Sequence, residues 1–191
     1  MCSTSPPAAA EGLQVELAEG DAEDLRFPDG AFDAVLSCLG VMFAPDQPRA
    51  AAELLRVCRP GGKVTLANWT PTSFIGAMLR TVGRYVPPPA GVPSPLRWGT
   101  EEGLRELLGS GAAELRCRRQ AFVFRYASPE DFADFFTTNY GPVHKAFQAQ
   151  DQAGRRCFHD DLVALAREHD RGPGPSVAMP SEYLQAVAVR A

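Results

Sequence analysis

The chain has 191 residues, of which 45% are hydrophobic and 22% are charged, and its formal net charge is −4. This composition is typical of a single globular domain, and a mildly acidic chain without a run of Lys or Arg argues against a nucleic-acid partner. No apolar run approaches the roughly 20 residues that cross a bilayer, and the first residues lack the pattern of a signal peptide, so we expect no membrane contact and a cytoplasmic location.

Cysteine and histidine spacing argues against a metal site. The five cysteines are scattered without a C-x-x-C pair, which favours reduced thiols over a disulfide framework or a zinc site. The stretch His159-Asp160-Asp161 offers ligand-type side chains, but no second cluster follows at metal-binding spacing. We therefore expect no bound metal.

The first third of the chain predicts two strands, a helix and a third strand. Residues 13–20 alternate apolar and polar side chains before a glycine, and the apolar run 32–36 follows a Pro-Asp-Gly turn signal. Residues 48–59 place apolar side chains at helical spacing. The Pro60-Gly61-Gly62 stretch then predicts a link from that helix to a strand that begins at Val64. Strands alternating with a helix in this way favour an α/β sheet.

The second half of the chain predicts mostly helices. Residues 71–86 favour a helix, residues 87–95 an extended loop, and residues 100–108 a short helix. Residues 114–126 alternate as a long strand. Ser128 before Pro129 is a favourable helix start, a further helix is expected over 152–169, and residues 181–191 predict a last strand. No repeat or linker divides the chain.

The sequence carries a resemblance in its first third. The stretch "VELAEGDAEDLRFPDGAFDAVLS", then a helix and "LLRVCRPGGKVTLANW", resembles the class I S-adenosylmethionine-dependent methyltransferases of the type-11 group. That group includes ubiquinone and menaquinone biosynthesis enzymes and many small-molecule methyltransferases. The resemblance implies a Rossmann-like α/β sheet that lacks its first two strands and has a helical insertion before the last strand. It divides the chain into a tail (1–12), a cofactor-side core (13–70) and an acceptor-side region (71–191).

The resemblance also implies site residues. The Asp21 carboxylate would accept a hydrogen bond from the adenine amino group, and the Ala22 N–H would meet a ring nitrogen. Ser37 and Cys38 follow a strand at the carboxyl edge of the sheet, where they would line the methionine end of the cofactor. The alternative is that Asp21 only forms a turn after Gly20. Trp69 is a candidate wall of the acceptor pocket.

Other apolar residues near these positions favour core packing instead of a site. Met42 and Phe43 stand at a strand-to-helix junction, where apolar side chains usually pack. We expect the same of Phe132, Phe135 and Phe136.

The reaction that the resemblance implies requires few catalytic groups from the protein. S-adenosylmethionine carries an activated methyl group, so the protein mainly holds a small-molecule acceptor in line and excludes water. The candidates for a general base are Asp46, His144 and Tyr140, and no motif supports any of them.

A G-x-G-x-G stretch after a strand is absent from the 191 residues. The resemblance implies a strand order 3-2-1-4-5-7-6, and loss of the first two strands would expose a sheet edge that invites association. We therefore expect a methyltransferase that is truncated at its N-terminus and impaired, with weak or absent cofactor binding. The alternatives are a non-catalytic protein that pairs with another methyltransferase chain, a homo-oligomer joined through the exposed edge, and, least favoured, an unrelated α/β enzyme.

Overall fold

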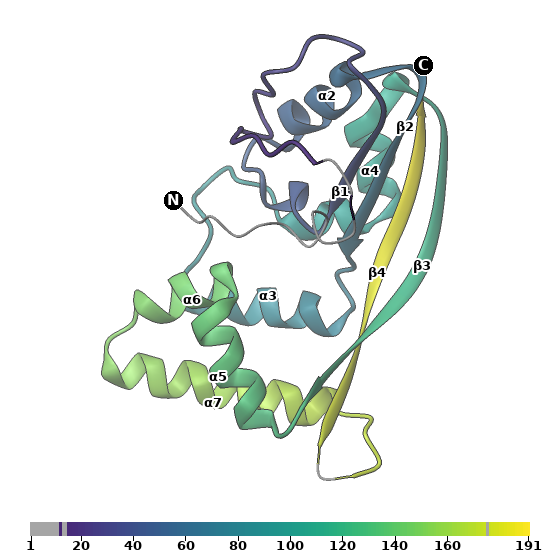
Figure 1. Cartoon of the computed structure of the whole chain (residues 1–191). Coiled ribbons are helices and arrows are strands. Elements are labelled where there is room, and N and C mark those ends of the chain that lie inside the picture. The colour runs from purple at the N-terminus through teal and green to yellow at the C-terminus, as the bar shows by residue number, and fades with distance from the viewer. Residues whose placement is uncertain (1–11, 13–14, 175) are drawn as a thin grey trace.

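The computed structural model describes residue 12, residues 15–174 and residues 176–191, and it contains a twisted mixed sheet with two groups of helices (Figure 1). The sheet has the strand order β1-β2-β4-β3. β1 is parallel to β2, whereas β4 is antiparallel to both β2 and β3. The strands are β1 (Phe32–Cys38), β2 (Cys58–Trp69), β3 (Ala112–Tyr126) and β4 (Val177–Arg190).

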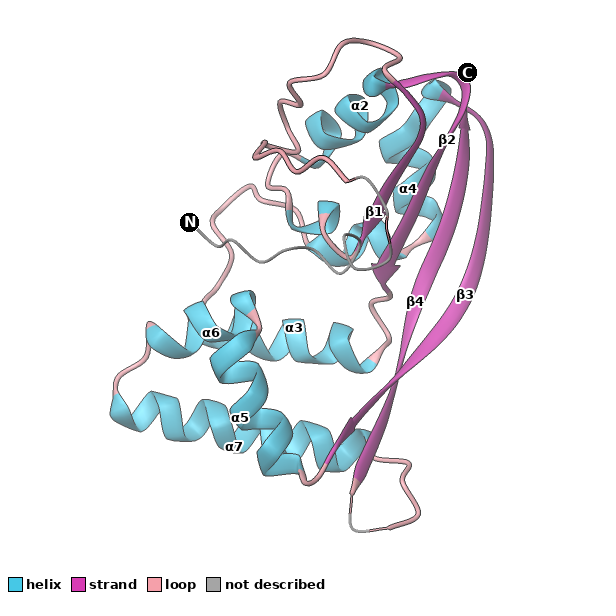
Figure 2. Ribbon diagram, viewed as in Figure 1, coloured by secondary structure: helices cyan, strands magenta, loops and turns pink. Residues whose placement is uncertain are grey.

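The helices gather in two groups along the sheet (Figure 2). The first group lies beside β1 and β2 and contains α2 (Gln47–Val57), α4 (Glu101–Leu108) and the 3-10 helices η1 (Val41–Phe43) and η2 (Pro95–Gly99). A further 3-10 turn, η3 (Gly109–Gly111), follows α4. The second group contains α3 (Phe74–Tyr85), α5 (Pro129–Asn139), α6 (Gly141–Gln148) and α7 (Gln152–His169). The long strands β3 and β4 reach both groups.

This architecture confirms the predicted fold class. The observed order β1-β2-β4-β3 corresponds to the last four positions, 4-5-7-6, of the order that the resemblance implies. Along the chain, the helices α5, α6 and α7 follow β3 and precede β4, and they form the predicted helical insertion before the last strand. The helix starts also follow local sequence signals, since the Ser128 hydroxyl accepts a hydrogen bond from the Asp131 N–H at 3.0 Å.

The strand predicted over 13–20 is wrong for its described part. Residues 15–20 form no strand, and residues 13 and 14 lie outside the described residues. The apolar side chains of this segment are exposed, at 52% for Val15 and 72% for Leu17. Alternation favours a strand only where a neighbouring strand satisfies the backbone groups, and no described strand pairs with this segment.

The starts of two strands and one additional helix also differ from prediction. Pro60, Gly61 and Gly62 were expected to link a helix to a strand, but they lie inside β2, which begins at Cys58. The extra residues produce an irregularity in the pairing of β2 with β1. A Cβ at Gly62 would lie 2.8 Å from the Asp33 carbonyl oxygen, so glycine permits the close approach of the two strands. The helix α6 was not predicted, and β4 begins four residues before the predicted 181.

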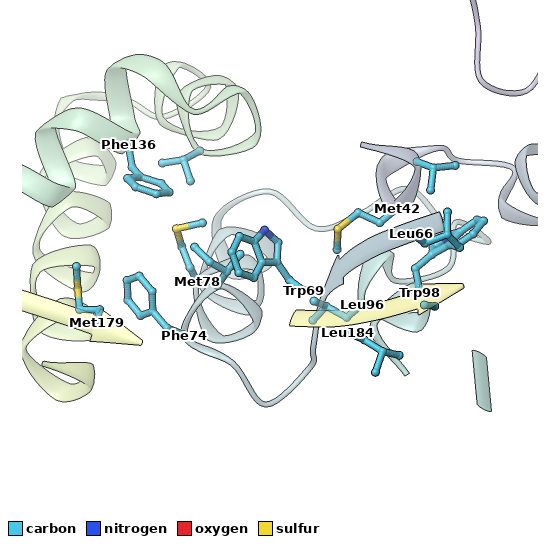
Figure 3. Packing of buried hydrophobic residues seen from close by; sticks show 14 of the residues in the cluster. Met42, Leu66, Trp69, Phe74, Met78, Leu96, Trp98, Phe136, Met179 and Leu184 are labelled. Carbon is cyan, nitrogen blue, oxygen red and sulfur yellow. The ribbon is translucent and has the colours of Figure 1, made fainter. Parts of the chain in front are cut away.

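The core extends through both helix groups (Figure 3). On one side, Met42 and Leu66 lie near Trp98 from η2. On the other side, Phe74 and Met78 from α3 lie near Phe136 and Met179, with Trp69 between the two sets. Trp69, the last residue of β2, thus stands between the two parts of the core.

Candidate functional site

The carboxyl end of β1 is held in a constrained turn. The Ser37 hydroxyl accepts a hydrogen bond from the Val41 N–H at 3.1 Å, and the Leu39 N–H donates to the Ala67 carbonyl at 2.8 Å. Leu39 has a φ of 57°, in the left-handed region that a branched side chain rarely adopts. Strained residues of this kind often mark functional sites, and Leu39 lies where two cavities approach each other.

A smaller cavity of about 360 Å³ opens on one side of this turn. Its lining comes from the loop after residue 20, from β1, from the segment between β1 and α2, and from α2 itself: Asp21, Ala22, Glu23, Leu25, Leu36, Ser37, Gly40, Val41, Ala44, Pro45 and Leu54. Asp21 Oδ1 accepts a hydrogen bond from the Glu23 N–H at 2.9 Å, which closes an Asx turn. The second oxygen of this carboxylate has no hydrogen-bond partner among the described residues, so it is free to accept one from a ligand.

The loop that carries Asp21 is attached to α2 through a buried carboxylate. Glu53, which is 6% exposed, accepts a hydrogen bond from the Leu25 N–H at 2.7 Å and pairs with Arg56 at 2.7 Å. Arg56 donates in turn to the carbonyls of Leu25 and Phe27, at 2.7 and 2.8 Å. The hydrogen bond from Arg56 is the main reason that the pKa of Glu53 falls from 4.5 to about 2. The loop is therefore fixed by charge and hydrogen bonds, although it forms no strand.

Asp46 strengthens the same attachment. Its carboxylate accepts a hydrogen bond from the Arg49 N–H at 3.0 Å and begins α2, while its own N–H donates to Glu23 Oε1 at 2.7 Å. Arg49 also donates to the Glu23 carbonyl at 2.8 Å. Asp46 is thus a helix cap, and it lines neither the smaller cavity nor the larger one described next.

The larger cavity, of about 720 Å³, lies between the sheet and the α3–α5 region. Its lining is mostly aromatic and aliphatic: Leu36, Ser37, Cys38, Leu39, Thr65, Leu66, Ala67, Trp69, Ile75, Phe122, Phe124, Tyr126, Phe135, Phe136, Asn139, Tyr140, Tyr183 and Gln185. None of these side chains, which all belong to the described part of the chain, is a carboxylate, an amine, a guanidinium or an imidazole. Leu36 and Ser37 line both cavities, so the two meet at the end of β1.

Trp69 is firmly placed in the wall of the larger cavity. Its side chain is 5% exposed, and its ring centroid lies 5.7 Å from that of Phe124 and 6.1 Å from that of Tyr183. Gly99 lies so close behind it that a Cβ at this position would overlap the Trp69 carbonyl oxygen. The backbone of Trp69 therefore has little freedom to shift.

Of the three predicted candidates for a general base, only Tyr140 lines the larger cavity. His144 Nδ1 lies 2.7 Å from the Thr137 carbonyl, on another part of the surface. The Tyr140 hydroxyl is buried and has no hydrogen-bond partner among the described residues. Burial raises the pKa of Tyr140 to about 12, so its hydroxyl stays protonated at neutral pH and acts as a donor.

Comparison with known proteins relates the chain to methyltransferases. A family model described as a methyltransferase domain matches residues 3–66. The family model thus covers about the first third of the chain. A solved S-adenosylmethionine-dependent methyltransferase from Thermotoga maritima aligns with a TM-score of 0.51 at 16% identity, covering 96% of this chain and 67% of that one, and it shares the class I fold.

Sequence relatives extend the comparison. The uncharacterised protein Rv1405c of Mycobacterium tuberculosis is 42% identical over 179 residues, which are 93% of this chain and 61% of the relative. The demethylmenaquinone methyltransferase of Thermus thermophilus is 45% identical over 64 residues, or 34% of this chain and 29% of that enzyme. The chain thus spans about three fifths of the length of Rv1405c.

The fold brings the predicted site residues together around β1. Asp21, Ala22 and Ser37 share the smaller cavity, and Cys38 and Trp69 share the larger one, with Ser37 common to both. Their contacts with a cofactor or an acceptor stay predictions.

Sequence reasoning missed much of the aromatic wall. Phe122, Phe124 and Tyr126 alternate along β3 and line the larger cavity, although the sequence pattern indicated only a strand face. Phe135 was expected in the core, but it is 48% exposed and lines the cavity. Phe136 is buried and also forms part of the wall.

The remaining core expectations have mixed outcomes. Met42 is 1% exposed and Phe132 is fully buried, so both pack in the core as predicted. Phe43 is 37% exposed, so the prediction that it packs in the core is wrong. It ends the three-residue helix η1, which turns its last side chain towards solvent.

Among the described residues, no three or more His, Cys, Asp or Glu side chains are grouped so as to hold a metal ion. His159 Nε2 instead lies 3.0 Å from Asp134 Oδ1. The helices of the described ranges include none that is both long and apolar enough to cross a membrane.

Proposed function

We propose that this chain transfers a methyl group from S-adenosylmethionine to a small-molecule acceptor. The observation that carries the proposal is the meeting of two chemically different cavities at Leu36 and Ser37. A methyl donor and an acceptor must be adjacent and in line, which two cavities that share a wall permit.

The smaller cavity suits the cofactor. One Asp21 carboxylate oxygen accepts no hydrogen bond from the described residues and would accept one from the adenine amino group, and the backbone N–H of Ala22 beside it would meet a ring nitrogen. Ser37 would lie against the methionine end, and Cys38, which lines the larger cavity, would lie beside it where the two cavities meet. The cofactor supplies the activated methyl group, and the protein residues bind and orient it.

The larger cavity suits the acceptor. Trp69 and the neighbouring rings give the region beside Ser37 an apolar surface, and Tyr140 offers a buried hydroxyl donor, so an acceptor that fills the cavity would displace water there. Exclusion of water protects the transferring methyl group and strengthens the polar contacts that remain. We expect the isolated chain to hold the cofactor weakly, because its sequence offers no glycine-rich turn to cradle the ribose and methionine groups.

Ultraviolet cross-linking with methyl-labelled S-adenosylmethionine, followed by peptide mapping, tests this proposal. We expect label in the peptide that contains Ser37 and Cys38, and competition by unlabelled S-adenosylhomocysteine. Label that maps only outside residues 21–45, or that the competitor does not displace, would contradict the assignment of the cofactor to the smaller cavity.

A second candidate function is a non-catalytic one, in which β1 pairs with a strand of another methyltransferase chain or of a second copy. Among the described strands, β1 is hydrogen-bonded to β2 alone, and its Leu36 side chain is 74% exposed. Edge strands of this kind readily pair. Light scattering of the purified 20.6 kDa chain separates the candidates, because a dimer mass without cross-linked cofactor favours the second.

A further inference from the structure

We infer that the larger cavity binds an uncharged ring compound, and that the Tyr140 hydroxyl donates a hydrogen bond to an oxygen of that compound. This inference names the acceptor class and rests on the proposed function for the reaction, although the binding that it describes can be measured without the cofactor.

The lining of the cavity selects against charged ligands. Its described side chains include no cation to pair with a carboxylate or phosphate, and no anion to pair with an amine. A charge moved from water into such a site loses its hydration without compensation. Amino acids, phosphorylated compounds and free polyamines are therefore poor ligands for this cavity.

The aromatic walls select for a flat apolar ligand. The ring centroids of Phe122 and Phe124 lie 4.9 Å apart, and those of Phe124 and Phe136 lie 5.9 Å apart. Both pairs are close to edge-on, at interplanar angles of 75° and 71°, so ring faces and edges are both presented in this wall. A cavity of about 720 Å³ has the size of a typical small-molecule site and accommodates a bicyclic ring.

Tyr140 gives the ligand its polar contact. Its hydroxyl is buried without a hydrogen-bond partner among the described residues, which is uncommon because buried hydroxyls normally have one. The residue lines the cavity, so an oxygen of a bound ligand would satisfy this donor.

The position of Tyr140 is fixed before any ligand binds. Its N–H donates to the Phe136 carbonyl at 3.1 Å at the end of α5, and its carbonyl accepts from the His144 N–H at 2.8 Å at the start of α6. Its ring lies 5.2 Å from that of Phe136. A donor held on both sides in this way loses little freedom on binding.

Three naphthalene probes test the inference: 1-naphthol, naphthalene and 1-naphthoate. They share one ring system and differ in a neutral hydroxyl, no polar group and a charged carboxylate. By equilibrium titration calorimetry of the full chain, we expect 1-naphthol to bind about tenfold more tightly than either of the other two.

The matched variants are Tyr140→Phe and Tyr85→Phe. Tyr140→Phe should weaken 1-naphthol binding about tenfold and leave naphthalene binding unchanged, because only the hydroxyl is removed. Tyr85 donates its hydroxyl to Asp161 at 2.7 Å outside the cavity, so Tyr85→Phe should change neither affinity. Circular dichroism confirms that each variant is folded.

Three results would overturn the inference: no binding of any probe, tightest binding of 1-naphthoate, or equal loss of 1-naphthol and naphthalene in Tyr140→Phe. None of these titrations contains S-adenosylmethionine. A chain that selects 1-naphthol but is not labelled by the cofactor would refute the proposed methyl transfer and leave this binding assignment intact.

Discussion

The smaller and larger cavities share one strand end but are built by different physical means. The smaller cavity is bounded by a loop without regular structure, which the Glu53–Arg56 pair attaches to α2. The larger cavity is bounded by rings on strands and helices, and its described side chains carry no charge. Charge and hydrogen bonds thus hold the wall of the smaller cavity, whereas close packing holds that of the larger one. We therefore expect loss of the charged contacts to affect the smaller cavity first, and loss of close packing to affect the larger cavity first.

The largest expected effect comes from packing behind Trp69. Gly99→Ala would place a Cβ against the backbone of Trp69, which cannot move without shifting the cavity wall. We expect the free energy of unfolding to fall by about 2–4 kcal/mol in urea titrations. Gly83→Ala is the matched control, since the Cβ would meet open space on α3 and should stabilise the helix by about 0.5–1 kcal/mol. Equal stability of the two variants would show that Gly99 does not limit the position of Trp69.

A smaller effect is expected from removal of the loop attachment. Arg56→Met takes away the donors to the carbonyls of Leu25 and Phe27 and leaves the Glu53 carboxylate without its cation. We expect a loss of about 2 kcal/mol and faster hydrogen exchange in residues 21–29, with little change around Trp69.

Arg59→Met is the control for this variant. Arg59 pairs with Asp33 at 2.6 Å, but the two side chains are 53% and 86% exposed. Such an exposed pair contributes about 0.5 kcal/mol or less. If Arg59→Met destabilised the chain as much as Arg56→Met, the special role of the buried attachment would be refuted.

The pH dependence of the Glu53 contribution is a finer test. The pKa of Glu53 is lowered from 4.5 to about 2, so its contribution to stability is complete above pH 4.5 and is lost as the pH falls towards 2. Glu53→Gln should therefore be less stable than the wild type by about 1 kcal/mol at pH 7, with the difference shrinking as the pH is lowered. Urea unfolding at several pH values measures this. A difference that grows on acidification would contradict the sign of the shift.

Much of the fold follows from local sequence signals. The helix predicted over 152–169 has those bounds in the structure, and Thr100 and Ser128 cap the helices that they were expected to begin. The helix α6 was missed because Tyr140 ends α5 and begins α6 directly, which leaves no separating loop in the sequence. The predicted strand at 15–20 failed because pairing depends on a neighbour, which alternation alone does not provide.

The site was predictable only in part, because much of it also depends on contacts between residues far apart in the chain. The resemblance indicated Asp21, Ala22 and Ser37, which lie close to one another at the end of β1. The aromatic wall depends on β3 pairing with β4 beside β2, a contact between residues far apart in the chain. The free hydroxyl of Tyr140 depends on which side chains surround it, so the sequence offered Tyr140 only as one candidate among three.

The central claim is that the smaller cavity binds the cofactor through Asp21, and Asp21→Asn tests it directly. The amide keeps an oxygen to accept from the Glu23 N–H, which holds the turn, but presents an NH₂ group where the free carboxylate oxygen stood. Asp24→Asn is the control, because it makes the same change on the same turn at a side chain that is 82% exposed and lies outside the cavity. Titration calorimetry with S-adenosylhomocysteine should show about tenfold weaker binding for Asp21→Asn and wild-type binding for Asp24→Asn. Equal affinities in all three proteins would contradict the claim.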